Sequence, residues 1–150
     1  MNIEKIANIT PEIKNKKLII TFSATGVPIT DIRLMDFLND SKKLAKDLDN
    51  TQINEFYFIF NIDKLKIPSN FNLFKQYASF LEKHKDLLMN KLVYSVLQCE
   101  NNIFKMFFNL FKAYYIPVKP LYLCKNVEEV TQCLENESFR NSLPNMEKMV

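Results

Sequence analysis

The chain has 150 residues, of which 47% are hydrophobic, and its formal net charge at pH 7 is +3. This length and apolar content are typical of one globular domain with its own core, not of a disordered chain. The single glycine, Gly26, excludes every glycine-rich phosphate-binding loop. Arg33 and Arg140 are the only arginines. Because arginine is the preferred residue for recognising phosphates and bases, we do not expect nucleic-acid binding.

The three cysteines, Cys99, Cys124 and Cys133, form no C-x-x-C motif. A disulfide framework or a zinc site needs more ligands at closer spacing, so we interpret them as free thiols in a reducing compartment. No stretch approaches the roughly 18 apolar residues of a membrane span. The N-terminal segment MNIEKIANITPEIKNKK is charged and lacks the apolar centre of a signal peptide. We therefore expect a cytoplasmic protein.

The N-terminal third predicts two antiparallel strands and a helix. Residues 6–13 alternate weakly and contain Pro11, which suits an edge strand because proline cannot donate to a ladder. Residues 18–22 are rich in β-branched side chains, and the lysines before them mark a turn. Thr30 is a predicted N-cap of a helix that ends near Asn50. The apolar residues of this helix recur at helical spacing: Leu34, Phe37, Leu38, Leu44, Ala45 and Leu48.

The rest of the chain predicts alternating strands and helices. Residues 56–60 form a continuous apolar run, as in a strand buried on both faces with helices above and below the sheet. Further elements are predicted as a helix over 71–89, a strand over 92–97, a helix over 101–115, a strand over 121–123 and a helix from Asn126 to Leu134. Residues 135–150 are polar, and we expect them to extend the last helix or to fray as a tail.

The resulting order, ββαβαβαβα, predicts one α/β domain over residues 1–150. Three consecutive β-α-β units imply parallel strands joined by right-handed crossovers. The first two strands are expected to pair antiparallel at one edge. We therefore predict a mixed, mostly parallel five-stranded sheet with helices packed on it.

Three segments carry a resemblance to a known family. FYFIFNIDKLKI is similar to a central strand that ends in an acidic residue, KLVYSVLQCENNIFKMFFNLF to a strand, turn and helix, and VKPLYLCKNVEEVTQCL to a last strand and helix. Over about residues 6–134 the chain resembles the STAS fold of anti-sigma-factor antagonists and sulfate-transporter tails, which is related to CRAL-TRIO lipid-binding domains. The resemblance implies a regulatory module that works by binding.

The resemblance also points to one modification site. The antagonist branch carries a phosphoacceptor serine or threonine in an Asp-Ser-Ser/Thr-Gly context after its central strand, where a phosphate gains from the free N–H groups of a helix start. The matching loop here, IPSNF, has Ser69 as its only hydroxyl and lacks the Asp and Gly. Ser69 is thus a candidate phosphoacceptor, and the alternative is that Ser69 or Asn70 caps the following helix.

Residue types that carry catalysis are scattered. The only histidine, His84, lies among charged residues, as on a solvated helix face. Asp63 ends the central strand, where α/β folds bind ligands, although an aspartate that stabilises a turn is commoner there. Glu128 and Glu129 suit the first turn of a helix because acids interact favourably with its dipole. We expect no enzyme, no metal site and no cofactor.

The aromatic segment, residues 101–115, is the most unusual stretch. At 100° per residue its apolar arc, extended by Met106, Leu110 and Ala113, spans about 220°. A helix that lies on a sheet needs an apolar stripe of only roughly 100°. Three interpretations stay open. Neighbouring elements cover both flanks, the extra arc contacts a protein partner or a second copy, or the face lines an apolar cavity or touches a membrane surface.

These observations predict a non-enzymatic, STAS-like interaction or regulatory module. The expected contact residues for a protein partner or a homodimer are Met106, Phe107, Leu110 and Phe111. One alternative is a carrier or sensor of a lipid or other apolar small molecule, which the relation to CRAL-TRIO domains implies. The other is an antagonist switch controlled by phosphorylation of Ser69.

Overall fold

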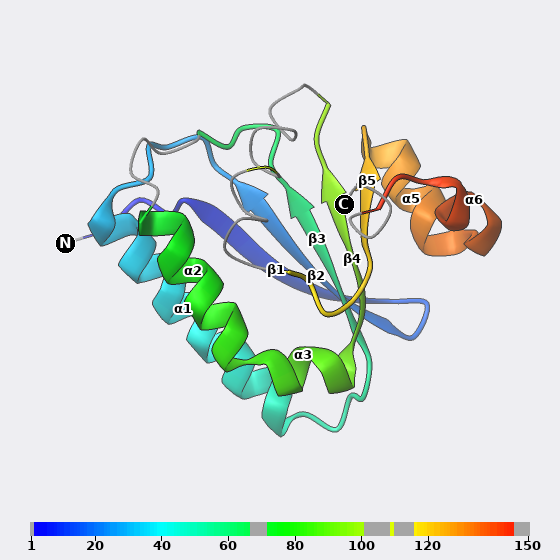
Figure 1. The fold of residues 1–150 in the computed structure, drawn as a ribbon, viewed down its shortest axis with the longest axis horizontal. Coiled ribbons are helices and arrows are strands. Elements are labelled where there is room, and N and C mark those ends of the chain that lie inside the picture. The colour runs from blue at the N-terminus through cyan, green and yellow to red at the C-terminus, as the bar shows by residue number, and fades with distance from the viewer. Residues whose placement is uncertain (1, 67–71, 101–108, 110–115, 146–150) are drawn as a thin grey trace.

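Five strands form one mixed sheet in the computed structural model, which describes residues 2–66, 72–100, 109 and 116–145. The strands lie side by side in chain order. β1 is antiparallel to β2, and β2 to β5 are parallel neighbours (Figure 1). Their bounds are β1 Ala7–Lys14, β2 Lys17–Ala24, β3 Phe56–Asn61, β4 Leu92–Gln98 and β5 Leu121–Cys124. The predicted α/β class and mixed, mostly parallel sheet are confirmed.

Helices cover both faces of this sheet, as the apolar run of β3 predicted. The described helices are α1 Asp31–Asn50, α2 Asn72–Lys83, α3 Lys85–Lys91, α5 Val127–Glu135 and α6 Glu137–Ser142. On one face, Leu48 of α1 and Leu88 of α3 pack with Phe56 and Phe58 of β3. On the other face, Val130 of α5 packs with residues of β2, β3 and β4, and α5 and α6 lie together at the β5 end of the sheet (Figure 1).

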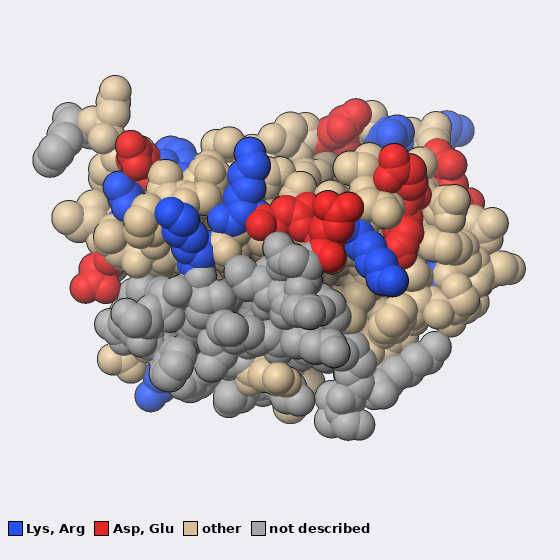
Figure 2. Space-filling model, turned by 90° about the horizontal axis from the view of Figure 1, so that it is seen from above, with Lys and Arg blue, Asp and Glu red and all other residues tan. Residues whose placement is uncertain are grey.

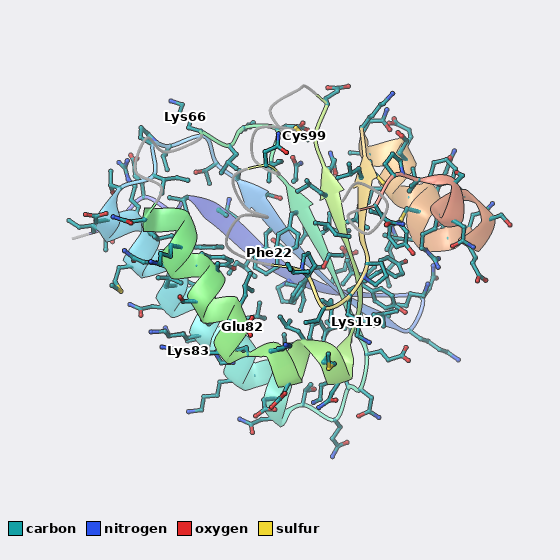
Figure 3. All side chains as sticks on the ribbon, in the orientation of Figure 1. Phe22, Lys66, Glu82, Lys83, Cys99 and Lys119 are labelled. Carbon is teal, nitrogen blue, oxygen red and sulfur yellow. The ribbon has the colours of Figure 1, made fainter. Side chains whose placement is uncertain are left out.

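An aromatic cluster joins α1 to the sheet. Phe22 of β2 lies between the strands and the α1–α2 layer (Figure 3). Its ring centroid is 4.9 Å from that of Phe60, 5.3 Å from that of Phe58 and 6.3 Å from that of Phe37 on α1. Each such pair contributes about 0.5–1.5 kcal/mol beyond the burial of its area. These contacts fix which side of α1 faces the core.

The β1–β2 hairpin explains why a proline is tolerated in a strand. Its two-residue turn places Asn15 and Lys16 at φ values of 53° and 67°, and Lys14 pairs with Lys17 across it. The pair that flanks such a turn is hydrogen-bonded, and the pairs then alternate. Pro11 falls at a non-hydrogen-bonded position, so its missing N–H costs no ladder bond and interrupts the open edge of the sheet.

Helix α1 begins and ends where the sequence predicts. The Oγ1 of Thr30 accepts a hydrogen bond from the Arg33 backbone N–H at 3.3 Å. The helix runs to Asn50, and its buried residues are Leu34, Leu38, Ser41, Ala45 and Leu48. Phe37 and Leu44, which were also predicted on the apolar face, are half-buried.

The predicted helix over 71–89 is wrong in one respect, because the chain breaks at His84 into α2 and α3. The His84 N–H donates to the Leu81 carbonyl, three residues back, so the last turn of α2 is tightened. His84 is not fully solvated as predicted. It is half-buried, with its ring centroid 4.7 Å from that of Phe80. The break orients α3 so that Leu88 enters the core, and no Gly or Pro in the sequence signals it.

The C-terminal segment is more ordered than the expected polar tail. The Asn136 side chain accepts from the Phe139 N–H at 3.0 Å and begins α6 as a separate helix. Leu143 is buried in the core beneath α5, and the Pro144 carbonyl accepts from the Leu123 N–H at 2.9 Å. The chain therefore returns to the outer edge of β5, and the apolar Leu143 in a polar stretch is what draws it back.

The Thr30 cap gives a direct test of the fold. Replacing Thr30 by Ala removes the acceptor for the Arg33 N–H, and we expect the free energy of unfolding to fall by about 1 kcal/mol. Thr30→Ser keeps the acceptor and should stay close to the wild type. Urea unfolding measures both variants. Equal stabilities for Thr30→Ala and Thr30→Ser would contradict the capping role.

Candidate functional site

The predicted contact residues Met106, Phe107, Leu110 and Phe111 lie outside the described residues, as does Ser69. The proposals built on them therefore stay predictions.

A row of apolar side chains crosses the sheet from β2 to β5. Phe22 pairs with Phe60, Phe60 with Leu97 and Leu97 with Leu123 on successive strands, so these side chains share one face. Leu97 is buried with Ile62 and Cys99, and among the described residues this cluster contains none from α1, α2 or α3. The described helices of this face thus pack on β1 to β3 and on Leu92 at the start of β4, and the row continues beyond them.

Asp63 has a structural role. Its Oδ1 accepts from the Glu100 N–H at 2.7 Å, and its own N–H donates to Asn61 Oδ1 at 3.1 Å. The carboxylate ties the segment after β3 to the segment after β4, as the turn-stabilising interpretation predicts.

The strands β2 to β5 point toward the face seen in Figure 2. On its described part, acidic and basic side chains are interspersed, so no patch of one sign marks a charged ligand.

The acidic pair at the start of α5 is also structural. Asn126 Oδ1 accepts from the Glu129 N–H at 2.9 Å, and Glu129 Oε2 accepts from the Lys125 N–H at 3.3 Å. This reciprocal arrangement closes the first turn of a helix. It confirms the predicted cap at Asn126, and Glu128 and Glu129 lie in the first turn as predicted.

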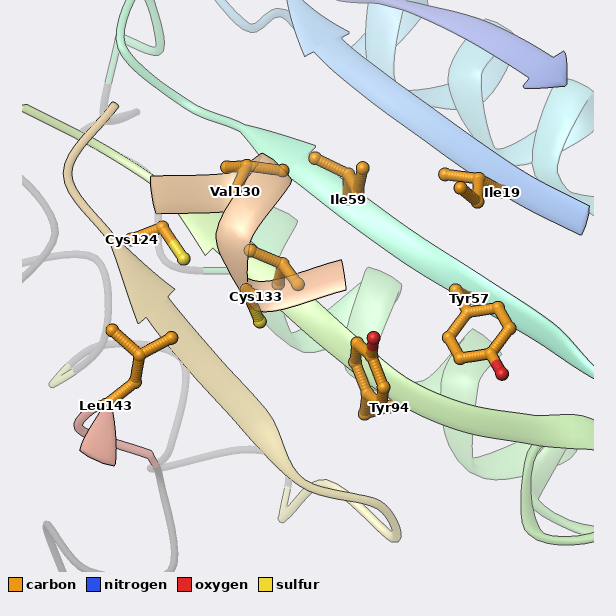
Figure 4. Close-up of a cluster of buried hydrophobic side chains, with 9 residues drawn as sticks. Ile19, Tyr57, Ile59, Tyr94, Cys124, Val130, Cys133 and Leu143 are labelled. Atoms are coloured by element: carbon orange, nitrogen blue, oxygen red, sulfur yellow. The ribbon is translucent and has the colours of Figure 1, made fainter. Parts of the chain in front are cut away.

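The buried face beneath α5 holds thiols and phenols in contact (Figure 4). Cys124, Cys133 and Cys99 are free and buried, which confirms the free-thiol prediction. A hydrogen bond with Cys133, together with burial, raises the pKa of the Cys124 thiol. Arg140 donates from Nε to the Cys133 carbonyl at 2.9 Å. The hydrogen bond with Cys124 lowers the pKa of the Cys133 thiol. Both side chains are buried among apolar residues, so the two thiols pack as part of the core.

Tyr94 lies in the same cluster with an unusual hydroxyl. The side chain is buried, and in the part of the chain that the structure describes its O–H has no hydrogen-bond partner. The Arg140 guanidinium lies 4.6 Å from its ring centroid. Burial raises the pKa of Tyr94 to about 12, although the Arg140 charge acts in the opposite direction. The ring is well packed, but the hydroxyl is desolvated without compensation.

A depression of about 220 Å³ separates the hairpin turn from the end of α5. Lys17 and Glu135 line it, and Lys17 Nζ donates to the Leu134 carbonyl at 3.1 Å while lying 5.3 Å from the Tyr57 ring centroid. A lysine at the last carbonyls of a helix caps that helix. We interpret this contact as structural.

The outer face of α1 carries an apolar surface that the sequence analysis missed. Ile32 is 67% exposed, Met35 53% and Ile3 38%. With Asp31, Asp36 and Asn39 they line an open depression of about 380 Å³. We call these six residues the α1 patch. At 100° per residue, Ile32 and Met35 lie about 160° and 100° from Leu34, so the same projection that was applied to residues 101–115 identifies them.

Within the described residues, no group of three His, Cys, Asp or Glu side chains is arranged to hold a metal ion. None of the described helices has the length and apolarity that crossing a bilayer requires. Comparisons of the chain with protein-family models, with curated proteins and with solved structures find no match. The resemblance to STAS domains therefore stays a prediction.

Tyr94 provides a test of this description of the core. Tyr94→Phe removes a buried hydroxyl that has no described partner, so we expect the variant to be more stable by about 1 kcal/mol near neutral pH. The half-buried Tyr122 of the same cluster serves as a control, because Tyr122→Phe removes no orphaned group and should give no gain. Urea unfolding measures both, and a loss of stability in Tyr94→Phe would contradict the description.

The same variant should change the response to alkali. The folded state holds the Tyr94 proton more tightly than the unfolded state, where the pKa of tyrosine is about 10. The contribution of Tyr94 protonation to the free energy of unfolding is therefore fully present below about pH 10 and is lost as the pH rises toward about 12. Urea unfolding at several pH values across this range should show that the free energy of unfolding decreases less steeply with pH for Tyr94→Phe than for the wild type.

Proposed function

We propose that this chain is a STAS-like protein-interaction module that acts through an apolar helix face. One observation carries the proposal. Helix α1 exposes Ile32 and Met35 beside Ile3, over an open depression. Single exposed apolar side chains are ordinary, whereas a contiguous group around a hollow commonly marks a binding surface. The α/β sheet and its strand order are compatible with a STAS-like fold, and that family assignment is part of the proposal.

The energetics indicate what kind of contact the α1 patch can make. Covering the exposed parts of Ile32 and Met35 contributes about 2–4 kcal/mol, judged from the value of fully burying such side chains. Association costs at least about 4 kcal/mol in lost translational and rotational freedom. The apolar side chains therefore cannot hold a partner by themselves, and the polar residues beside them, Asp31, Asp36 and Asn39, must contribute contacts.

The aromatic segment remains the second proposed surface, with Met106, Phe107, Leu110 and Phe111 as its contact residues. The apolar row of Phe60, Leu97 and Leu123 continues beyond the described helices. One side of the wide apolar arc that the sequence predicts for residues 101–115 can pack on this row. A helix with such an arc has apolar side chains left over for another contact. The apolar-ligand and Ser69 alternatives stay predictions.

Site-specific cross-linking tests the proposal. A photoreactive amino acid is placed at Met35 in the full chain, and a matched probe is placed at Met89 on α3, which is 49% exposed against 53% for Met35. In cells that express the chain, we expect a cross-linked protein product of defined mass from position 35 and none from position 89. A third probe at Leu110 examines the aromatic segment in the same way.

The result that contradicts the proposal is equally specific. If positions 35 and 110 give no more product than position 89, neither apolar face contacts another protein. A product from position 110 alone supports the aromatic segment and removes the α1 patch from the proposal.

A further inference from the structure

We infer that the partner on the α1 patch is a second copy of this chain, with the two α1 helices paired antiparallel about a two-fold axis near Asn39. This inference rests on the proposed function, because it names the occupant of the same surface. It follows from the charge order along α1, from the spacing of its outward residues and from the chemistry of the depression.

The charges of α1 are unequally distributed between its two halves. The first half carries three acids, Asp31, Asp36 and Asp40, with one cation, Arg33, whereas the second half exposes three lysines, Lys42, Lys43 and Lys46, with two acids, Asp47 and Asp49. Two copies laid antiparallel bring the net-acidic half of one helix against the net-basic half of the other. A two-fold axis requires a self-complementary surface of this kind, since every contact occurs twice.

The outward residues also have the spacing that helix pairing needs. Ile32, Met35, Asn39, Lys42 and Lys46 follow one another at intervals of three or four residues and fall within a sector of about 80° at 100° per residue. Residues at this spacing are neighbours on the helix surface and form one continuous stripe, apolar in its first half and basic in its second.

The register follows from placing Asn39 opposite Asn39 of the second copy. Ile32 then lies opposite Lys46 of the second copy, and Met35 opposite Lys43. Asp36 and Lys43 lie on the same flank of the stripe, and in an antiparallel pair each flank meets itself. Asp36 of each copy therefore meets Lys43 of the other within about one residue, a 1.5 Å rise.

The depression has the chemistry that receives a lysine. Ile3, Ile32 and Met35 supply an apolar wall for the four-carbon stem, while Asp31 and Asp36 supply carboxylates for the ammonium group. Lys5 already binds Oδ2 of Asp36 at 2.8 Å and Oδ2 of Asp40 at 2.9 Å, so its one charge is shared between two acids. A carboxylate accepts several hydrogen bonds, and Oδ1 of Asp36 faces no competition from these contacts.

Other occupants fit less well. An anionic membrane surface is repelled by the carboxylates of the patch. Pairing through the sheet edge is hindered by Pro11 in β1, and the β5 edge is occupied by the returning chain at Pro144. The second copy supplies both the apolar stems and the lysine charges that the α1 patch lacks.

A charge swap tests this register in the purified full chain. Sedimentation velocity over a wide concentration range should show a monomer–dimer equilibrium that weakens as salt is raised. Asp36→Lys and Lys43→Asp should each weaken the dimer by about tenfold or more, because each creates two like-charge contacts. The double variant restores opposite charges across the axis and should return the dissociation constant to within about threefold of the wild type.

Two controls separate the interface from general effects. Lys75→Asp on α2 makes the same charge change at an exposed position away from the stripe and should leave the dimer unchanged. Met35→Asp should abolish the dimer, whereas Met89→Asp should not, and circular dichroism checks that all variants are folded. These methionine variants keep the test decisive if Asp36→Lys loses stability with its Lys5 contact.

The outcomes distinguish this inference from the proposed function. A chain that stays monomeric at every concentration, while position 35 still cross-links another protein, overturns the second copy and leaves the interaction module standing. If position 35 gives no cross-link and the chain forms no dimer, the second copy and the interaction module are both overturned for the α1 patch. A dimer that survives Met35→Asp, or a double variant without rescue, overturns the antiparallel register.

Discussion

Strand β3 is buried on both faces, and most of the architecture follows from that constraint. Phe56, Tyr57, Phe58 and Ile59 are each less than 10% exposed, so apolar side chains point both up and down from the centre of the sheet. A parallel sheet of this kind must be covered on both sides. The helices α1 and α3 meet this need on one face, and α5 with the returning C-terminal segment meets it on the other.

The same constraint determines what α1 presents to solvent. Because Leu34, Leu38 and Leu48 must face the core, the helix cannot rotate to hide Ile32 and Met35. Their exposure is therefore a consequence of sequence placement and not of loose packing. The β1 edge of the sheet is interrupted by Pro11, and the β5 edge is bonded to the returning chain at Pro144.

Local chemistry made much of the fold predictable. Thr30 and Asn126 were recognisable as caps because their side chains can accept hydrogen bonds at a helix start, and the β-branched and aromatic runs marked the strands. The break at His84 was not predictable, because the apolar spacing continues across it and tertiary packing of Leu88 decides the direction of α3. The return of Leu143 to the core likewise depends on a long-range contact that no local pattern contains.

The exposed apolar surface of α1 was less predictable from the sequence than the fold. Excess apolar surface was predicted only for the aromatic segment, residues 101–115, and no exposed apolar residue was predicted on α1. Ile32 lies between two charged residues in the sequence, and Met35 lies beside the core residue Leu34, so the two exposed side chains come together only once the helix forms. Ile3 could not have been added, since its approach to α1 is a tertiary contact.

Methyl resonances measured as a function of protein concentration test the central claim most directly. With isotope labels on the isoleucine and methionine methyl groups of the intact chain, the account predicts that Ile32, Met35 and Ile3 shift together as the concentration rises. Ile13 and Met89, which are also exposed, should stay unchanged. Concentration-independent signals at Ile32 and Met35, or shifts confined to other methyl groups, would contradict the claim that a second copy covers the α1 patch.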